Sequence, residues 1–226
     1  MSFFSRHKEN ILVASKREQH NAVVHLVEQG TLGSGYYMLL ILATLIVTPG
    51  LLIGNVSVII GGMILAPLMV PLLSISLALV AGSLGGFLRA MKILVISIFI
   101  TIGTAALMTI ILSRTNNVVT WIPEQISPGI YIFIAFCSGV AGAFAWVKKD
   151  LSSSVAGVAV AVSLLPPLCA AGIGLALAEF TLVQNSLVLF AANLVGICMA
   201  AFLVFWILGF LNSAKLEEKE IEKVES

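Results

Sequence analysis

The sequence predicts an all-α, polytopic membrane protein with six transmembrane helices. Hydrophobic residues make up 59% of the chain, charged residues only 10%, and the mean hydropathy is +1.09. Such values are typical of integral membrane proteins. The charges gather near the two ends of the chain. Between them lie six segments that offer the about 20 mostly apolar residues a span needs, namely 35–53, 56–81, 89–112, 129–147, 154–178 and 182–211.

The remaining stretches predict how the chain is organised around these spans. Residues 1–33 are expected to form one cytoplasmic amphipathic helix, which glycines end before the first span. Residues 34–113 form a first three-helix repeat, residues 114–128 an outer loop, and residues 129–212 a second three-helix repeat. The charged residues 213–226 are expected to be a cytoplasmic tail, either a short exposed helix or disordered.

The basic residues predict the topology, because loops rich in lysine and arginine stay on the cytoplasmic side. With six crossings and a cytoplasmic N-terminus, Arg114 alone falls outside. The inner basic residues are Arg6, Lys8, Lys16, Arg17, Arg89, Lys92, Lys148, Lys149, Lys215, Lys219 and Lys223. If the second and fifth segments were re-entrant hairpins, Arg89 and Lys148 would lie outside with their neighbours. The charges therefore favour true crossings, with both termini cytoplasmic.

Two proline-containing stretches read as degenerate copies of each other. In the first, GGMILAPL (61–68) leads into ISLAL (75–79); in the second, AVSLLPPL (161–168) leads into IGLAL (173–177). Each repeat has three spans, an odd number, so the second repeat enters the membrane from the opposite face. The sequence thus predicts a 3+3 inverted repeat, which is the architecture of many secondary transporters.

The prolines predict that helices two and five are interrupted. Proline removes a backbone hydrogen bond and clashes with the preceding turn, and hydrocarbon cannot supply the missing partner. A straight helix over 56–81 would be about 39 Å long, against a hydrocarbon core of about 30 Å. Pro67 and Pro71 lie four residues apart, and Pro166 and Pro167 are adjacent. The alternative is a proline-kinked helix whose neighbours satisfy the freed carbonyls.

Small residues around these prolines complete a candidate binding site. We expect opened backbone from the two repeats to face itself and to line a site for a small solute or ion. The candidate substrate-binding residues are Gly61, Gly62, Pro67, Pro71, Ser74, Ser163, Pro166, Pro167, Gly172, Gly174 and Asn193. Small side chains also let helices approach closely in lipid, so packing alone would explain most of this set.

The scarcity of polar residues in the spans excludes several function classes. Asn193 lies near the middle of the sixth span, where its amide bonds across helices or orients a ligand. No acidic or basic residue lies at mid-depth, where a proton relay usually has one. The sequence offers no catalytic acid pair, no metal-ligand triad and no activated nucleophile in the spans. We expect no enzyme, cofactor or metal site, and interpret Cys137, Cys169 and Cys198 as packing residues.

Three stretches resemble a known family of prokaryotic hydrophobic membrane proteins, catalogued as domain of unknown function 389. The stretches are IIGGMILAPLM (59–69), SVAGVAVA (154–161) running into LLPPL (164–168), and Asn193 within LFAANLV (189–195). The likeness covers residues 35–210. Many relatives have serine before the first proline where this chain has Ala66, so no mechanism that needs a hydroxyl there is expected. The resemblance implies a multi-pass protein of the prokaryotic inner membrane, and it brings no substrate.

Two function classes follow from these patterns. The first is a transporter or channel for a small solute or ion, which predicts a polar cavity at mid-depth between the second and fifth spans. The second is a structural or regulatory membrane protein that forms homo-oligomers through small-residue helix faces, which predicts a dry, well-packed centre. The expected partners are the lipid bilayer, the small solute or ion, and further copies of the chain; nucleic acid is not expected.

Overall fold

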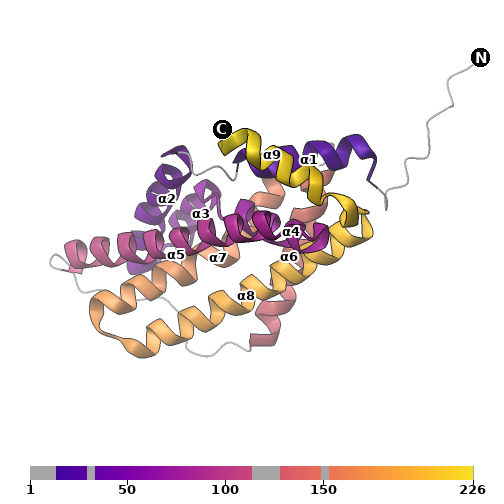
Figure 1. Cartoon of the computed structure of the whole chain (residues 1–226). Coiled ribbons are helices and arrows are strands. Elements are labelled where there is room, and N and C mark those ends of the chain that lie inside the picture. The colour runs from indigo at the N-terminus through magenta and orange to yellow at the C-terminus, as the bar shows by residue number, and fades with distance from the viewer. Residues whose placement is uncertain (1–13, 30–33, 114–127, 149–152, 226) are drawn as a thin grey trace, which may run out of the picture.

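The computed structural model describes residues 14–29, 34–113, 128–148 and 153–225, and within these ranges the fold is all-helical (Figure 1). The elements in chain order are α1 (Lys16–Gln29), α2 (Ser34–Leu52), α3 (Val56–Leu65), α4 (Met69–Ala81), α5 (Leu84–Ser113), α6 (Pro128–Val147), α7 (Ser153–Leu177), α8 (Phe180–Ile207), the 3-10 turn η1 (Phe210–Asn212) and α9 (Ala214–Glu225). The predicted outer loop, apart from its last residue, lies outside the described residues.

The apolar helices are those of a membrane protein. Four of them, α2, α5, α6 and α8, are long and apolar enough to cross a bilayer, and the bent pair α3 and α4 makes a fifth if it is counted as one span. In α7 the part with described side chains, Leu164–Leu177, is apolar but shorter than a span. The third predicted span begins earlier than expected, at Leu84 instead of Arg89.

The predicted second span consists of two helices that meet at an angle of 52°. Asn55 caps the start of α3, since its side chain accepts a hydrogen bond from the Val58 amide at 3.2 Å. The helix ends at Ala66, whose extended backbone (φ −75°, ψ 121°) is the conformation preferred before a proline. Pro71 lies in the first turn of α4, where a missing amide hydrogen costs no helical bond.

The interruption predicted for the fifth span is wrong. The helix α7 is continuous from Ser153 to Leu177 and contains both Pro166 and Pro167. Packing explains why it persists, because α7 contacts α2, α3, α5, α6 and α8, and Leu164, Leu165 and Leu168 beside the prolines are fully buried. Neighbouring helices can hold a proline-containing span together in this way.

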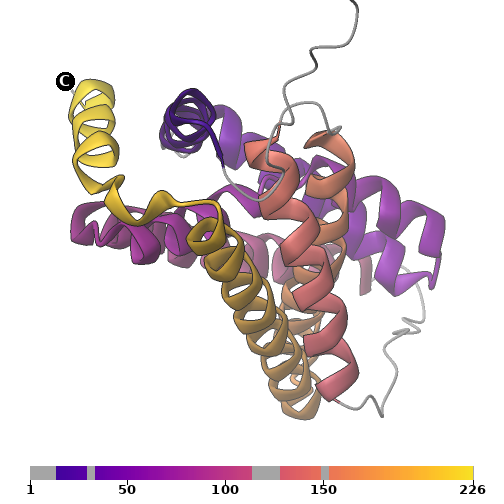
Figure 2. The ribbon, with the colours of Figure 1, turned by 90° about the vertical axis from the view of Figure 1, so that its right-hand side faces the viewer.

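Glycines bring the helices of the second half into close contact. An ideal Cβ on Gly139 of α6 would lie 2.8 Å from the Ile197 carbonyl oxygen of α8, and one on Gly196 would lie 2.9 Å from the Ile132 oxygen of α6. Figure 2 shows α6 and α8 packed along much of their length. Such reciprocal small-residue contacts are typical of helix pairs in membranes.

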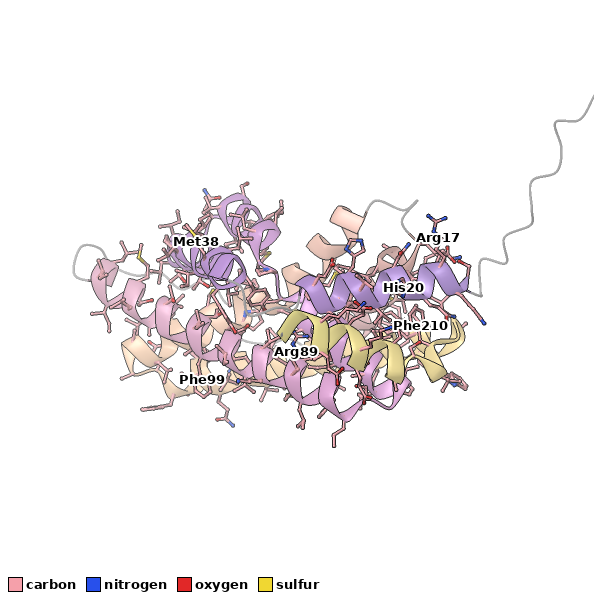
Figure 3. The ribbon with its side chains drawn as sticks, turned by 45° about the horizontal axis from the view of Figure 1, so that its top comes forward. Arg17, His20, Met38, Arg89, Phe99 and Phe210 are labelled. Atoms are coloured by element: carbon pink, nitrogen blue, oxygen red, sulfur yellow. The ribbon has the colours of Figure 1, made fainter. Side chains whose placement is uncertain are left out.

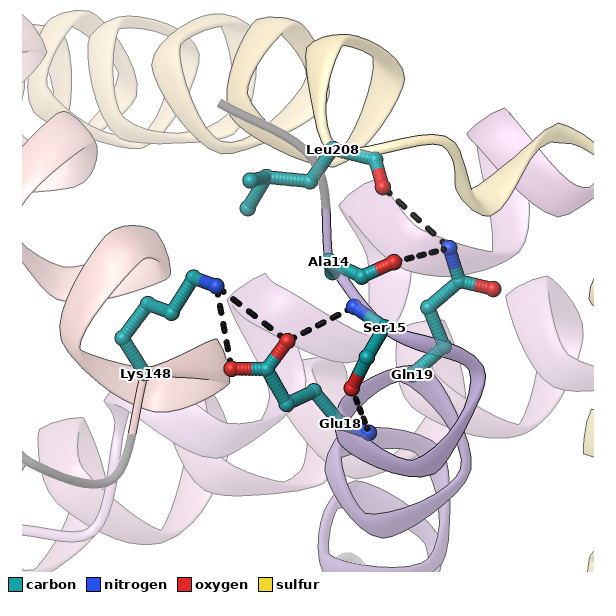
Figure 4. Close-up of polar contacts among 6 residues, drawn as sticks. All are labelled: Ala14, Ser15, Glu18, Gln19, Lys148 and Leu208. Carbon is teal, nitrogen blue, oxygen red and sulfur yellow. Dashed lines mark hydrogen bonds and ion pairs between the residues drawn. The ribbon is translucent and has the colours of Figure 1, made fainter. Parts of the chain in front are cut away.

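Two amphipathic helices, α1 and α9, lie side by side at one end of the molecule. In α1, the Ser15 hydroxyl accepts a bond from the Glu18 amide, and the Glu18 carboxylate accepts one from the Ser15 amide (Figure 4). This capping box begins the helix. Polar bonds then join α1 to the second half of the chain, through Lys148 to Glu18 at 3.0 Å and through the Gln19 side chain to the Leu208 carbonyl at 3.2 Å.

Candidate functional site

The break between α3 and α4 places irregular backbone inside the protein. Ala66 and Leu68 on either side of Pro67 are buried. The Ala66 amide donates to the Met63 carbonyl at 3.2 Å, and the Val70 amide donates to the Pro67 carbonyl at 3.3 Å. The break is therefore a defined turn with its own hydrogen bonds, and it redirects the chain into the α4 helix, most of whose residues are buried.

The predicted glycines and prolines of the first repeat have different surroundings. Gly61 is exposed, and a Cβ there would meet nothing within 4 Å. Gly62 is buried against α2, where a Cβ would lie 3.1 Å from the Ala43 carbonyl oxygen. Pro71 is buried in α4. Only Gly62 of the two glycines is required by packing, so the structure separates residues that the sequence grouped together.

In the second repeat the predicted glycines are contact positions between helices. A Cβ on Gly172 would lie 2.6 Å from the Ile102 carbonyl oxygen of α5, and one on Gly174 would lie 2.9 Å from a Val183 methyl group of α8. Pro166 is half-buried and Pro167 is buried in α7. Ser163 lies in α7, but its side chain is outside the described part of the chain. These glycines therefore favour the packing interpretation.

The buried amide predicted to orient a ligand lies in α8, three and four residues before Gly196 and Ile197, which contact α6. Asn193 is 1% exposed. Further along α8, the Ser76 hydroxyl of α4 lies 2.9 Å from the Leu72 oxygen and 3.2 Å from the Cys198 carbonyl oxygen of α8. Figure 1 shows α4 and α8 running toward the same end of the molecule. Pro71 precedes Ser76 in α4 and Asn193 precedes Cys198 in α8, so both residues lie toward the N-terminal ends of their helices relative to this bond. The amide is thus on the side of the contact where α4 begins.

A cavity of about 20 Å³ lies near the other end of α4, and it is large enough for about one water molecule. Its polar lining residues are Ser74 of α4, Arg89 of α5 and Glu217 of α9, with Gly86 beside them. Ser74 is the one predicted site residue here. The cavity lies between α4, α5, α1 and α9, not between the second and fifth predicted spans where we expected a polar cavity.

Sequence reasoning missed Glu217, because the charged tail was expected to be exposed or disordered. The structure shows the tail as the helix α9 with Glu217 only 3% exposed. The pKa of its carboxyl group is raised from 4.5 to about 7, mainly by burial and further by the nearby Glu218, while Arg89 acts in the opposite direction. The apolar residues of the tail, Leu216, Ile221 and Val224, recur at helical spacing and were the signal that this helix packs on the protein.

The helices around the Pro67 break can offer neutral polar groups to a ligand. Among the described residues, none at the centre of the bundle is charged. The elements α3 and α7 are in contact, whereas α4 contacts α7 only slightly and packs mainly on α5 and α8. The structure thus places α4, which begins just after the Pro67 break, closer to α8 than to the helix that contains Pro166 and Pro167. The groups available there are backbone carbonyls, a buried amide and hydroxyls, which suit neutral solutes and weakly held ions.

Comparisons with known proteins agree with the sequence resemblance. A family model described as a domain of unknown function, DUF389, matches residues 63–199, a range that includes the Pro67 break, both prolines of α7 and Asn193. The chain is similar to an uncharacterised protein of Methanocaldococcus jannaschii, with 28% identity over 178 residues, which covers 74% of this chain and 52% of the relative. The chain therefore spans about half the length of this curated relative. No solved structure matches.

Proposed function

Because this chain belongs to the family described as domain of unknown function 389, a description that names no activity, we propose a function from the geometry: a membrane transporter or channel for a small solute or ion. The proposed site lies at the Pro67 break, with Pro71 in the first turn of α4 beside it. Asn193 of α8 stays the residue predicted to orient the ligand. The remaining predicted residues of the second repeat, Pro166 and Pro167 among them, serve as the opposing wall formed by α7.

The break itself carries the proposal. Bilayers tolerate non-helical backbone at membrane depth only where protein buries it or where it lines a water-filled path. The turn at Ala66, Pro67 and Leu68 is covered by protein on both sides of the proline, and it joins an edge helix to a buried one. Discontinuous helices of this kind form the substrate sites of many secondary transporters.

The pattern of helix contacts supports the inverted repeat. We take α2, the α3–α4 pair and α5 as the first three spans, and α6, α7 and α8 as the second three. In each half the third helix packs on the proline-containing helix of the other half, α5 on α7 and α8 on α4. Two contacts match: Gly172 approaches the Ile102 oxygen, and Ser76 approaches the Cys198 oxygen. Ile102 and Cys198 stand equally far from the first residues of their helices.

The location of charged groups supports six crossings. Lys148, after α6, pairs with Glu18 of α1, and Arg89, near the start of α5, lies beside α9 (Figure 3). Both basic residues are therefore at the end of the molecule where α1 and α9 lie. This is the arrangement expected if α1, α9 and these loops all face the cytoplasm.

The substrate class follows from the absence of charge in the two proline-containing segments. Residues 56–81 and 154–178 contain no acidic or basic residue and no histidine. Carbonyl, hydroxyl and amide dipoles can replace part of the hydration shell of a small neutral solute or a monovalent ion. They are poorly suited to a strongly charged substrate, for which a charge partner is usual in a membrane.

A second candidate function is supported by the glycines. Gly62, Gly172 and Gly174 all lie where a side chain would collide with a neighbouring helix. This arrangement is what a structural or regulatory protein would need, and it extends to association between copies of the chain. The two candidates differ in whether water reaches the break.

Flux through reconstituted vesicles tests the proposal. The purified chain in liposomes is expected to pass at least one of four probes, urea, glycerol, potassium or chloride, faster than protein-free vesicles. Pro67→Ala, which supplies the missing amide at the break, is expected to lower this flux at least tenfold. Pro49→Ala, which removes a proline from within α2, is the matched control and should retain it. Equal flux in the two variants contradicts a site at the Pro67 break, and no flux above empty vesicles for any probe contradicts transport.

Thiol labelling separates the two candidates directly. In a chain whose native cysteines are replaced by alanine, Ala66→Cys is expected to react with a charged, water-soluble methanethiosulfonate. Ala171→Cys, fully buried in α7, is the control and should be protected. Protection of both positions, with correct folding shown by an unchanged melting temperature, favours the structural function.

A further inference from the structure

The carboxyl group of Glu217 is held against the first turn of α5. Gly86 provides the space, because an ideal Cβ there would lie 2.7 Å from the Glu217 Cδ and closer still to Oε1. The Ser83 hydroxyl accepts a bond from the Gly86 amide at 3.1 Å and so caps this turn. Because Gly86 has no side chain, α9 can approach α5 at this position.

The surroundings of the Glu217 carboxyl group offer little to stabilise a negative charge on it. Glu217 is 3% exposed, and its Oε2 has no hydrogen-bond partner among the residues that the structure describes. Most of the surrounding lining is apolar, with Leu26 and Val27 of α1, Leu77 of α4 and Ile221 of α9. An unbonded carboxylate in such a site is costly, whereas a neutral carboxyl group is much less so.

We propose that Glu217 is a protonation-controlled latch, which holds α9 against α4 and α5 over the Ser74 cavity when its carboxyl group is neutral and releases α9 when it is charged. The proposal concerns α9 and stands apart from the proposed transport function. Figure 3 shows Arg89 on α5 beside α9 and α1, at the cavity that α9 covers. Release of α9 would open that cavity to solvent.

The charged groups on the neighbouring elements set the direction of the pH response. Arg89 of α5 and the amide groups of its first turn favour the carboxylate, whereas Glu218 of α9 opposes it. On α1, His20 interacts electrostatically with Glu220 of α9. The helix α4 carries no charged residue. Burial outweighs the groups that favour the carboxylate, and the pKa of Glu217 is therefore raised to about 7 when α9 is docked.

The sign of the effect follows from this raised pKa. Docking is fully favoured below the ordinary value of 4.5, where the carboxyl group is neutral in both states. Between 4.5 and about 7 the released form loses its proton first, so docking weakens as the pH rises and stays weak above 7. The shift corresponds to a factor of up to about 300 in the docking equilibrium.

Hydrogen–deuterium exchange of the intact protein in nanodiscs tests the latch. At each pH, amide exchange in α9 is compared between the wild-type chain and Glu217→Gln, a neutral mimic of the protonated side chain. Comparing the two proteins at the same pH cancels the intrinsic pH dependence of amide exchange. Between pH 5 and pH 8.5, α9 protection in the wild type is expected to fall at least tenfold relative to the variant. Glu222→Gln, a change at an exposed residue of α9 that does not contribute to the pKa shift of Glu217, should keep the wild-type response. Identical pH responses in the wild type and Glu217→Gln overturn the proposal.

A glycine pair provides an independent test that does not depend on how well glutamine fits. Gly86→Ala fills the space of the carboxyl group and is expected to lower α9 protection at least tenfold at pH 5. Gly85→Ala is the matched control, because a Cβ on Gly85 meets nothing within 4 Å. If the two alanine variants protect α9 equally, the carboxyl group does not hold the helix there, and the latch is wrong.

Discussion

The two proline-containing segments of this protein have related sequences and different shapes. Around Pro67 the chain leaves one helix and enters another at 52°, whereas around Pro167 a single helix continues through two adjacent prolines. The leucines two positions before these prolines show the difference in environment. Leu65 is 40% exposed and Leu165 is fully buried.

The difference teaches that neighbours decide what a proline does in a membrane helix. A proline inside a helix costs about 3 kcal/mol, and only packing on several sides can offset this cost. The helix α7 packs on helices all around it, whereas α3 packs on α2 and α7 and turns Ile60 and Ile64 outward. The peripheral segment bends, and the central one stays helical.

The largest expected effect comes from truncating the paired leucines. Leu165→Ala leaves a cavity among tightly packed helices and is expected to destabilise the protein by about 2–4 kcal/mol. Leu65→Ala removes contacts with the membrane surroundings and is expected to change stability by less than about 0.5 kcal/mol. Unfolding in mixed micelles of rising dodecyl sulfate content measures both. Similar losses in the two variants would mean that the segments do not differ in packing.

Glycine substitutions are expected to give the next largest difference. Gly172→Ala drives a methyl group toward the Ile102 carbonyl, a backbone atom that cannot move aside, and is expected to cost about 1–3 kcal/mol. Gly61→Ala adds a methyl group in open space and should be neutral or slightly stabilising, because alanine favours helix. Melting temperatures in detergent measure the pair. A stable Gly172→Ala variant would show that α5 and α7 are less tightly packed than the structure indicates.

The helix positions were largely predictable because apolar runs and capping residues are local features. The predicted starts and ends of α2, α6, α7 and α8 agree with the structure within a few residues. The bend at Pro67 also follows from local rules, since proline constrains the residue before it. The start of α5 was predicted at Arg89, whereas the helix begins five residues earlier, at Leu84.

The candidate site was less predictable, because burial depends on which helices become neighbours. Nothing in the local sequence distinguishes Gly61, which faces open space, from Gly62, which touches α2. The same limit applies to Pro166 and Pro167, whose helix survives through contacts made by distant segments. Glu217 shows it most clearly, since a glutamate in a charged tail gives no local sign that Gly86 leaves room for its carboxyl group.

A smaller effect is expected at the hydroxyl that joins the first segment to the second half of the chain. Ser76→Ala removes the hydroxyl that bonds the Leu72 and Cys198 carbonyls and is expected to cost about 0.5–1.5 kcal/mol, the range for single bonds between membrane helices. Ser74→Ala, in the same helix but lining the cavity, is the control and should change stability less. Thermal unfolding in detergent compares them. Equal changes would mean that the bond to α8 contributes nothing beyond the bond within α4.

The smallest expected effect is at α1, which is tied by polar bonds to the second half of the chain. Burial by itself raises the pKa of Glu18, but bonds from the Ser15 amide, Lys148 and the Ser15 hydroxyl outweigh burial, so the pKa lies below 4.5. This contribution is present above pH 4.5 and is lost as the pH falls through the lowered pKa. Because the pair is partly exposed, Glu18→Gln is expected to cost about 0.5–1 kcal/mol at pH 7.

The pH dependence distinguishes this ion pair from a general loss of packing. The difference in melting temperature between the wild type and Glu18→Gln should shrink as the pH is lowered from 7 toward 3.5, because protonation removes the charge that the substitution removes. Glu222→Gln, an exposed position on α9, is the control and should show no such difference at either pH. A Glu18→Gln deficit that persists unchanged at pH 3.5 would mean that α1 is held by its capping bonds and apolar contacts, and that Lys148 adds no measurable stability to the second half of the chain.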